Sequence, residues 1–569
     1  MAKPQIVVVG LDGATFDVIR PLIARGSLPN IGRLMAEGTS ATLKSTIHPI
    51  TPSAWASMVT GLNPGKHGVF DFRRRKPDSY QFELVNGGMR DGTPIWTILN
   101  QHGKKTGMLN IPLTYPPDQV DGFVVSGMDA PSSSSNMTYP RRLYQRMQQA
   151  LGEYIIDFSG YATSEEEYLR SSVRTLDIRV KSVHFLCEEY PDLDFLFVVF
   201  VAPDRLQHAF WCYVDPSSPQ YHLPKAHEYR SATETAYGVI DDAIGWLMSR
   251  FGDGTYYLLV SDHGFGPLHK DVYLNKWLSD IGLLKFREDK EAHSSLFPSD
   301  VDWSATKAYS FGHFGNISIN LHGREPSGAV AEGKDAEQIK EFIIRELHEL
   351  TDPESHSPVV DRVFRKEQLY SGPYFFGAPD LLIVMKNYTY MTRDSYDRVT
   401  PALMGPPMEL NPELIPHTGN HNLDGIFVLR GEGVTSGLEL PELHITDVAP
   451  TILYLLDLPI PNDMDGRVPL EAMTGHPLAA KSPSVLASKP SIGGLRANAH
   501  LQRGEMARLQ QLAELRSQEI AVLRSRLEKQ AEEVARLESL VAAYNRGRFI
   551  RCTAALDRVI RRLRRATGG

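Results

Sequence analysis

The feature that most constrains this chain is a buried strand that ends in an acidic residue and a histidine. The segment Leu258–Pro267, LLVSDHGFGP, is an apolar run that passes into a glycine-rich turn, with Asp262 and His263 at the exit. Functional groups collect at the carboxyl ends of strands in open α/β sheets, so this pair is well placed to hold a ligand or a metal. Taken alone, the segment is more typical of an ordinary turn, because aspartate and glycine favour turns.

Three other segments carry residues of the same chemical type. They are Ile6–Leu11 followed by Asp12, Phe195–Val201 followed by Asp204 and His208, and Gly419-Asn420-His421. We interpret each as the exit of a parallel strand that is buried on both faces, because the runs are apolar without alternation. Asp204 and His208 are four residues apart, which places both side chains on one face of a helical turn.

Together the four segments supply three carboxylates and three imidazoles. Mixed aspartate and histidine ligands favour zinc, or manganese and iron where carboxylate ligands predominate. Six ligands are too many for one tetrahedral ion. They match two ions about 4 Å apart, an arrangement that clamps both oxygens of an in-line phosphoryl displacement.

Helical patterns alternate with these strands. The apolar spacing predicts a helix pair over Asp17–Gly38, broken at Pro29, and long amphipathic helices over Ser164–Tyr190 and Ala226–Phe251. Because each long helix precedes a predicted strand, the pattern is βαβ throughout. It predicts an α/β fold with a mostly parallel central sheet between two helical layers.

Length and composition narrow the class of protein. At 569 residues the chain suggests one large catalytic domain with appendages. The sequence shows no signal-peptide pattern and no apolar stretch long enough to span a membrane. We therefore expect neither a signal peptide nor a membrane span. Three scattered cysteines fit a reducing compartment, and we expect a cytoplasmic protein. The catalytic part has no broad basic stripe, which disfavours nucleic acid as a partner.

A candidate nucleophile lies in the stretch TIHPITPSAWASMVTG. Thr51 precedes Pro52 and a short helical run, which predicts Thr51 as the N-cap and Pro52 as the first helical residue. A hydroxyl there lies beside free backbone N–H groups and the positive end of the helix dipole, which stabilise an alkoxide or a bound phosphate. The alternative is that Thr51 is only a cap.

The motifs as a series resemble the alkaline phosphatase superfamily, and within it the type I phosphodiesterase/nucleotide pyrophosphatase branch. The resemblance covers roughly residues 5–475 and rests on GLDGATFD, ITPSAWASMVTGLNPGKHGVFDF, APDRLQH, SDHGFGP, GNHNLDGIF and ITDVAPTILYLLDLPIPNDMDG. It implies a three-layer αβα alkaline-phosphatase-like sandwich that holds two divalent ions. It implies one zinc on Asp204, His208 and His421, another on Asp12, Asp262 and His263, and Thr51 bridging toward the metals and attacking phosphorus.

The family pattern is incomplete in one respect. Nucleotide pyrophosphatases have an Asn shortly after the His-Gly that follows the nucleophile helix, and its amide helps to bind a phosphoryl oxygen. Here the residues after His67-Gly68 are VFDF, which removes a stabiliser of developing charge. We therefore consider other groups near the substrate: Lys66, Asp71, Arg73, His269 and Lys270. The run Arg73-Arg74-Arg75 is more typical of an exposed loop, and His269-Lys270 is as typical of an exposed turn as of a substrate site.

The chain divides into four predicted parts. Residues 1–475 form the catalytic domain, with a substrate-covering insertion within 270–415, and residues 476–500 form a flexible linker rich in Pro, Ser, Ala and Gly. Residues 501–545 predict a coiled coil, since ten of twelve a and d positions are apolar. Residues 546–569 carry eight arginines and one aspartate, which predicts a basic amphipathic tail.

These patterns leave two classes of function. The first is a two-metal phosphohydrolase or phosphodiesterase with a phospho-threonine intermediate, acting on a small substrate such as a nucleotide, a sugar nucleotide or a lipid phosphate. The second is a catalytically weak scaffold that keeps the fold and the metals while the coiled coil mediates assembly. In either case we expect a homo-oligomer, and the tail can contact an anionic membrane, such as the inner membrane surface.

Overall fold

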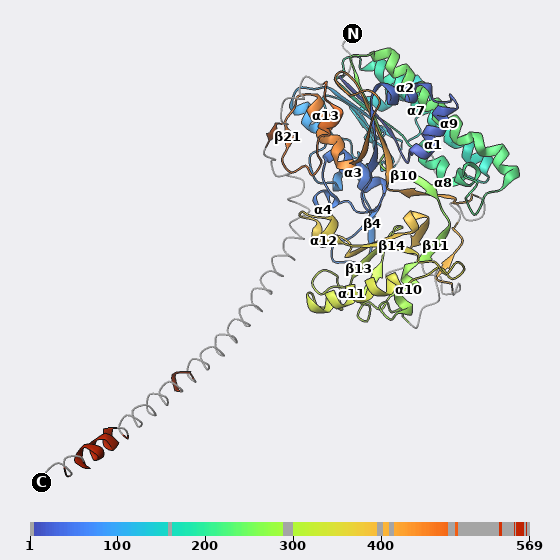
Figure 1. The fold of residues 1–569 in the computed structure, drawn as a ribbon. Helices are drawn as coiled ribbons and strands as arrows, with labels where there is room; N and C mark the ends of the chain where they lie inside the picture. The colour runs from blue at the N-terminus through green and yellow to red at the C-terminus, as the bar shows by residue number, and fades with distance from the viewer. Residues whose placement is uncertain are drawn as a thin grey trace. The chain divides into compact units, whose positions relative to one another are not determined.

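The computed structural model describes most of the chain (Figure 1). The described residues are 5–131, 133–157, 162–287, 300–394, 402–408, 415–475, 484–486, 534–536 and 551–565 without 552, 563 and 564. The chain divides into two compact units, Met1–Arg496 and Ala497–Gly569, and each is described here by itself.

A nine-stranded sheet forms the centre of the first unit. Its order is β20-β2-β19-β9-β1-β8-β5-β6-β7. Strand β1 runs parallel to β8 and β9, and β8, β5 and β6 continue in the same direction, whereas β19 is antiparallel to both neighbours. The prediction of a mostly parallel sheet is confirmed. In sheet order the strands are Leu438–His444, Thr39–Lys44, Asp424–Arg430, Tyr256–Val260, Ile6–Leu11, Phe195–Phe200, Thr106–Leu109, Gly122–Val125 and Thr138–Tyr139.

Helices cover both faces of this sheet. Alternate residues of β1 point to opposite sides, so that Val7 and Val9 join one apolar core and Ile6 and Val8 join another. The first core contains residues of α1, α2, α7, α8 and α9, and the second contains residues of α3, α5 and α13 (Figure 1). Their bounds are Phe16–Ala24, Pro29–Glu37, Glu165–Glu189, Ala202–Val214 and Leu223–Phe251 for the first, and Thr51–Thr60, Ile95–Gln101 and Val448–Leu455 for the second.

Residues within 270–415 form a lobe with a core of its own. It has an antiparallel sheet, β12-β13-β15-β14, and a smaller sheet, β16-β11-β17. The strands of the first sheet, in its order, are Ala308–Ser310, Asn316–Ile319, Leu381–Met385 and Val360–Arg365. Those of the second are Tyr390–Arg393, Lys270–Tyr273 and Met404–Gly405. The lobe also contains the helices α10 (Leu274–Asp280) and α11 (Lys334–His348). The apolar core of this lobe is separate from the two cores of the large sheet. That the lobe covers a substrate remains a prediction.

One predicted strand exit is wrong in its topology. The residues Gly419-Asn420-His421 do not end a strand of the large sheet. They belong to β18 (Gly419–Asn422), which pairs antiparallel with β10 (Gly264–Pro267), the strand directly after Asp262-His263. The short polar segment is followed by the apolar run that enters the large sheet as β19, so the histidine lies before that strand and not after it.

Most of the predicted C-terminal elements lie outside the described residues. Of the predicted coiled coil only 534–536 are described, and they are helical; of the predicted linker, Val485–Leu486 form β22, which pairs with β21 (Ile460–Pro461). The described residues of the tail are helical, with Leu556, Val559 and Ile560 exposed. Among the described residues, no helix is long and apolar enough to cross a membrane.

Candidate metal centre

Adjacent strands bring the predicted ligands to one edge of the large sheet. Because β1 lies between β8 and β9, the residues that follow these three strands are neighbours. Asp12 follows β1, Asp204 lies in the first turn of α8 after β8, and Asp262-His263 connects β9 to β10. These side chains are buried, as are Thr51 and His421.

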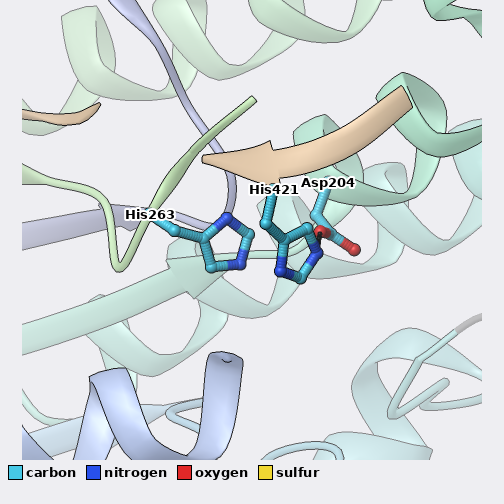
Figure 2. A group of neighbouring side chains, drawn as sticks. All are labelled: Asp204, His263 and His421. Atoms are coloured by element: carbon cyan, nitrogen blue, oxygen red, sulfur yellow. Dashed lines mark ion pairs between the residues drawn. The ribbon is translucent and has the colours of Figure 1, made fainter. Parts of the chain in front are cut away.

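The first predicted ligand set converges on a single point. Oδ1 of Asp204 lies 3.0 Å from Nε2 of His421 and 3.4 Å from Nε2 of His208. The two imidazole nitrogens are 3.0 Å apart. Figure 2 shows Asp204 and His421 side by side, with the ring of His263 next to them; the rings of His263 and His421 stack with centroids 3.6 Å apart.

His263 of the second predicted set lies next to the candidate nucleophile and to both carboxylates of the set. Nε2 of His263 lies 3.3 Å from Oδ2 of Asp262, 3.5 Å from Oδ1 of Asp12 and 3.4 Å from Oγ1 of Thr51. His263 also lies close enough to Asp204 and His421 for one ion to meet all three side chains. The structure therefore brings together all seven residues that the resemblance implied.

The donor atoms of both sets fit transition-metal ions. Zinc binds nitrogen and oxygen ligands at about 2.0–2.2 Å, so tetrahedral ligands lie roughly 3.3–3.5 Å apart. Four of the six separations above lie in this range, and the two that involve Nε2 of His421 are shorter, at 3.0 Å. In addition, one oxygen of each carboxylate is buried without a hydrogen-bond partner: Asp12 Oδ1, Asp204 Oδ1 and Asp262 Oδ2. These are the oxygens that face the imidazole nitrogens, and buried oxygens of this kind need a cation or a donor.

Backbone carbonyls orient the three imidazoles. An Nδ1–H group that donates to a carbonyl fixes the ring and leaves Nε2 as the free acceptor, the form in which histidine binds a metal. The acceptors at Nδ1 are Gly264 for His263 (3.0 Å), Pro49 for His421 (2.8 Å) and Gly419 for His208 (3.0 Å). All three Nε2 atoms therefore face the centre with a lone pair.

Burial and mutual repulsion disfavour the charged form of two of the three carboxylates. Burial, together with the neighbouring carboxylates, raises the pKa of Asp12 and Asp262 well above the usual range. Burial also acts to raise the pKa of Asp204, whereas His208 and His421 in their protonated forms, together with Arg205, lower that pKa to well below the usual range. A divalent ion would stabilise all three charged forms at once.

Several supporting residues could not be identified from the sequence alone. Arg205 donates to Asp204 Oδ2 at 2.7 Å and pairs with Asp157, which lies 48 positions away along the chain. Gly13 donates its backbone N–H to Asp262 Oδ1 at 3.2 Å, and a Cβ at Gly13 would lie 3.2 Å from the backbone of Asp204. The only sequence signal was adjacency, since both residues directly follow a ligand.

The predicted cap at Thr51 is wrong by one position. Helix α3 begins at Thr51, Ile50 is the N-cap, and no side chain caps the helix. Pro52 therefore occupies the second helical position, where it also lacks a hydrogen to donate. The hydroxyl of Thr51 is directed at His263 and not at the backbone of its own helix.

Three of the five further substrate-site candidates pair with other groups. Lys66 pairs with Asp465, Arg73 with Asp394, and Lys270 with Asp352 and Glu354. Asp71 is buried with both carboxylate oxygens unpartnered, and burial raises its pKa to about 7. His269 Nε2 is likewise buried without a partner. The described contacts of these residues do not include the seven ligands, so a role at the substrate remains a prediction.

Comparison with known proteins agrees with the fold and identifies the family. A family model described as type I phosphodiesterase / nucleotide pyrophosphatase matches residues 6–414. Among solved structures, phosphonoacetate hydrolase from Sinorhizobium meliloti 1021 is 15% identical with a TM-score of 0.50, covering 80% of this chain and 95% of that chain. Human ectonucleotide pyrophosphatase / phosphodiesterase 5 is 14% identical with a TM-score of 0.46, covering 83% and 98%.

No curated protein matches the chain. The structural neighbours are too distant in sequence to show more than the fold, whereas the family model spans most of the chain. The chain belongs to the type I phosphodiesterase/nucleotide pyrophosphatase family of the alkaline phosphatase superfamily and is a phosphoric ester hydrolase.

Proposed function

We propose that the protein is a two-metal phosphodiesterase or phosphohydrolase in which Thr51 attacks phosphorus. One observation carries the proposal: three buried carboxylate oxygens without partners face three imidazole nitrogens, and the hydroxyl of Thr51 lies 3.4 Å from one of these nitrogens. The family is a class of divalent-metal-dependent enzymes, which agrees with this donor set. Zinc is the ion that mixed aspartate and histidine ligands favour.

The residues of the chain have distinct tasks in the proposed reaction. When bound, two divalent ions supply positive charge at the phosphoryl oxygens and at the oxygen of the nucleophile. Asp204, His208 and His421 hold one ion, and Asp12, Asp262 and His263 hold the other. Thr51 is held at the start of α3, where the positive end of the helix dipole favours the charged alkoxide over the hydroxyl.

The proposed reaction has two displacements. In the first, Oγ1 of Thr51 forms a bond to phosphorus while the bond from phosphorus to the leaving alcohol oxygen breaks; that oxygen gains a proton from water, and the hydroxyl proton of Thr51 passes to solvent. In the second, water replaces the threonine oxygen on phosphorus. The products are the alcohol and a phosphate or phosphomonoester, and Thr51 regains its proton.

One sequence feature keeps a second function open. The residues 69–72 contain no asparagine, so the amide donor of the nucleotide pyrophosphatases is missing, and the described contacts do not bring Lys66, Arg73 or Lys270 to the ligands. A site with weak stabilisation of the phosphoryl oxygens would turn over slowly. The alternative proposal is therefore a scaffold that keeps the metals and assembles through its C-terminal part.

Metal analysis and turnover together test the proposal. We expect purified protein to hold about two transition-metal ions per chain, to lose turnover of bis-p-nitrophenyl phosphate on chelation, and to regain it with zinc. Faster turnover of this diester than of p-nitrophenyl phosphate would identify a diesterase. A folded protein with two ions and no turnover of either ester would favour the scaffold, and one ion or none would contradict the two-metal site.

We also propose that the protein is cytoplasmic and assembles through residues 501–545, with the tail bound to anionic membrane. The described thiols Cys187 and Cys212 are free and buried, in keeping with a reducing compartment. We expect the intact chain to sediment as a dimer or trimer and to bind acidic liposomes, whereas a chain that ends at residue 499 should be an active monomer that does not bind them. A monomeric intact chain at micromolar concentration would contradict assembly.

A further inference from the structure

A pocket of about 370 Å³ lies at the start of helix α3, the helix that carries the candidate nucleophile. Twelve residues line it, and the first of them, Pro52, directly follows Thr51 in helix α3. Nine of the twelve are apolar, including Phe72, Leu84, Leu113 and Met128. The pocket is large enough for an organic group of moderate size, and its mainly apolar lining is typical of pockets that bury such groups.

The one charged residue in the wall is already engaged. Asp129 accepts hydrogen bonds from the backbone N–H groups of Gly87 (3.2 Å), Thr114 (3.3 Å) and Tyr115 (2.8 Å). These hydrogen bonds connect three segments of the wall, so the Asp129 carboxylate stabilises the shape of the pocket. The side chains of Asn86 and Tyr115 add a little polarity at the wall.

The lining contains no lysine, arginine or histidine. A polyphosphate chain or a second charged phosphate would have no cation to meet there, and its desolvation would be uncompensated. The chemistry of the wall therefore selects against charged groups and favours an uncharged, mainly apolar one.

An exposed leucine lies at this pocket. Leu84 is 72% exposed, the largest exposed fraction among the large apolar side chains of the described residues, and it is on β4 (Phe82–Leu84) of a hairpin with β3 (Arg73–Arg75). Leu84 extends the apolar wall of the pocket toward solvent. A ligand that fills the pocket can cover this side chain as well.

We propose that this pocket binds an apolar alkyl group of the substrate, so that the enzyme acts on phosphate or phosphonate esters of apolar alcohols in preference to nucleotides and sugar nucleotides. The inference rests on the proposed function for its chemistry, because it places the alkyl group next to the phosphorus that Thr51 attacks. The binding of the alkyl group itself depends only on the pocket.

A binding series tests the pocket without turnover. n-Alkylphosphonates from methyl to hexyl are titrated by calorimetry into the metal-loaded protein. Each added methylene should tighten binding by about fourfold, so that hexylphosphonate binds about a thousandfold more tightly than methylphosphonate. Adenosine 5′-phosphate, whose group at the phosphate is polar, should bind more weakly than hexylphosphonate.

A matched pair of variants assigns the effect to the pocket. Leu84→Asp puts a charge at the pocket on a side chain exposed enough for the fold to tolerate it, and it should reduce the gain to less than about twofold per methylene. Met408→Asp, at a 48% exposed methionine that does not line the pocket, should keep the full gain.

The outcomes test the proposed pocket and the proposed reaction independently of each other. A chain-length gain without turnover of any ester would support the pocket and contradict the proposed function. Turnover of diesters with equal binding of methyl- and hexylphosphonate would overturn the pocket and leave the function standing. Tighter binding of adenosine 5′-phosphate than of hexylphosphonate would also overturn the proposal, as would a Leu84→Asp variant that keeps the full gain.

Discussion

Thr51→Ala should abolish turnover while leaving the fold and the bound metals in place. The reason is that the variant removes the attacking oxygen, and loss of a nucleophile costs about a thousandfold or more in kcat in enzymes of this kind. The structural cost should be about 1 kcal/mol or less, because the hydroxyl makes no cap hydrogen bond in α3. Metal content and the melting temperature should therefore stay close to those of the unchanged protein.

Thr51→Ser provides the matched control for this experiment. Serine keeps an oxygen at the same position beside His263, so the variant should retain a substantial part of the rate. Rapid quenching with a radiolabelled phosphate ester should then trap label on the unchanged protein and on the serine variant, and none on the alanine variant. If Thr51→Ala turns over at a near-normal rate, water attacks phosphorus directly and the proposed intermediate is wrong.

The strands and their exits were predictable because each carries a strong local signal. Continuous apolar runs such as Ile6–Leu11 are typical of parallel strands buried on both faces, and β1 has this environment. Aspartate at the end of such a run is a local pattern as well. Since parallel strands end at one edge of a sheet, three of the exits had to lie together once the sheet was known.

The position of His421 shows why the rest of the metal centre could not be predicted from the sequence. Its segment has the residue types of a ligand but no apolar run before it, and its position depends on antiparallel pairing with β10, more than 150 residues earlier in the chain. Pairing at this distance in the sequence depends on tertiary contacts, which no local pattern encodes. The contact of Arg205 with Asp157 escaped prediction for the same reason.

The lobe within 270–415 was predicted only as an insertion. Its strands are short, and two small sheets share one apolar core, so none of its strands has a strong periodic signal. By contrast, the long helices α7 and α9 lie within a few residues of their predicted bounds, because 25 and 29 residues of amphipathic sequence average out local ambiguity.

Asp262→Asn should remove one metal ion per chain and abolish turnover. Asparagine has nearly the same size and can keep the hydrogen bond that Gly13 donates to Oδ1, but its amide brings no negative charge to the atom that faces His263. Elemental analysis should fall from about two ions to about one, since the set of Asp204, His208 and His421 keeps all its ligands. A variant that retains both ions would show that Asp262 is not a ligand.

The same variant should have opposite effects on the metal-free and the metal-loaded protein. Burial and Asp204 raise the pKa of Asp262 in the folded, metal-free chain, so that the native state loses stability as the pH rises from the unfolded value near 4 through the higher folded value. Asparagine removes this cost, and the chelated variant should melt at a higher temperature than the chelated unchanged protein at neutral pH. With zinc in excess the order should reverse, because only the unchanged protein gains the stabilisation from its second ion. A residue that merely packs in the core would shift both melting temperatures in the same direction, so the reversal distinguishes a metal ligand from a structural aspartate.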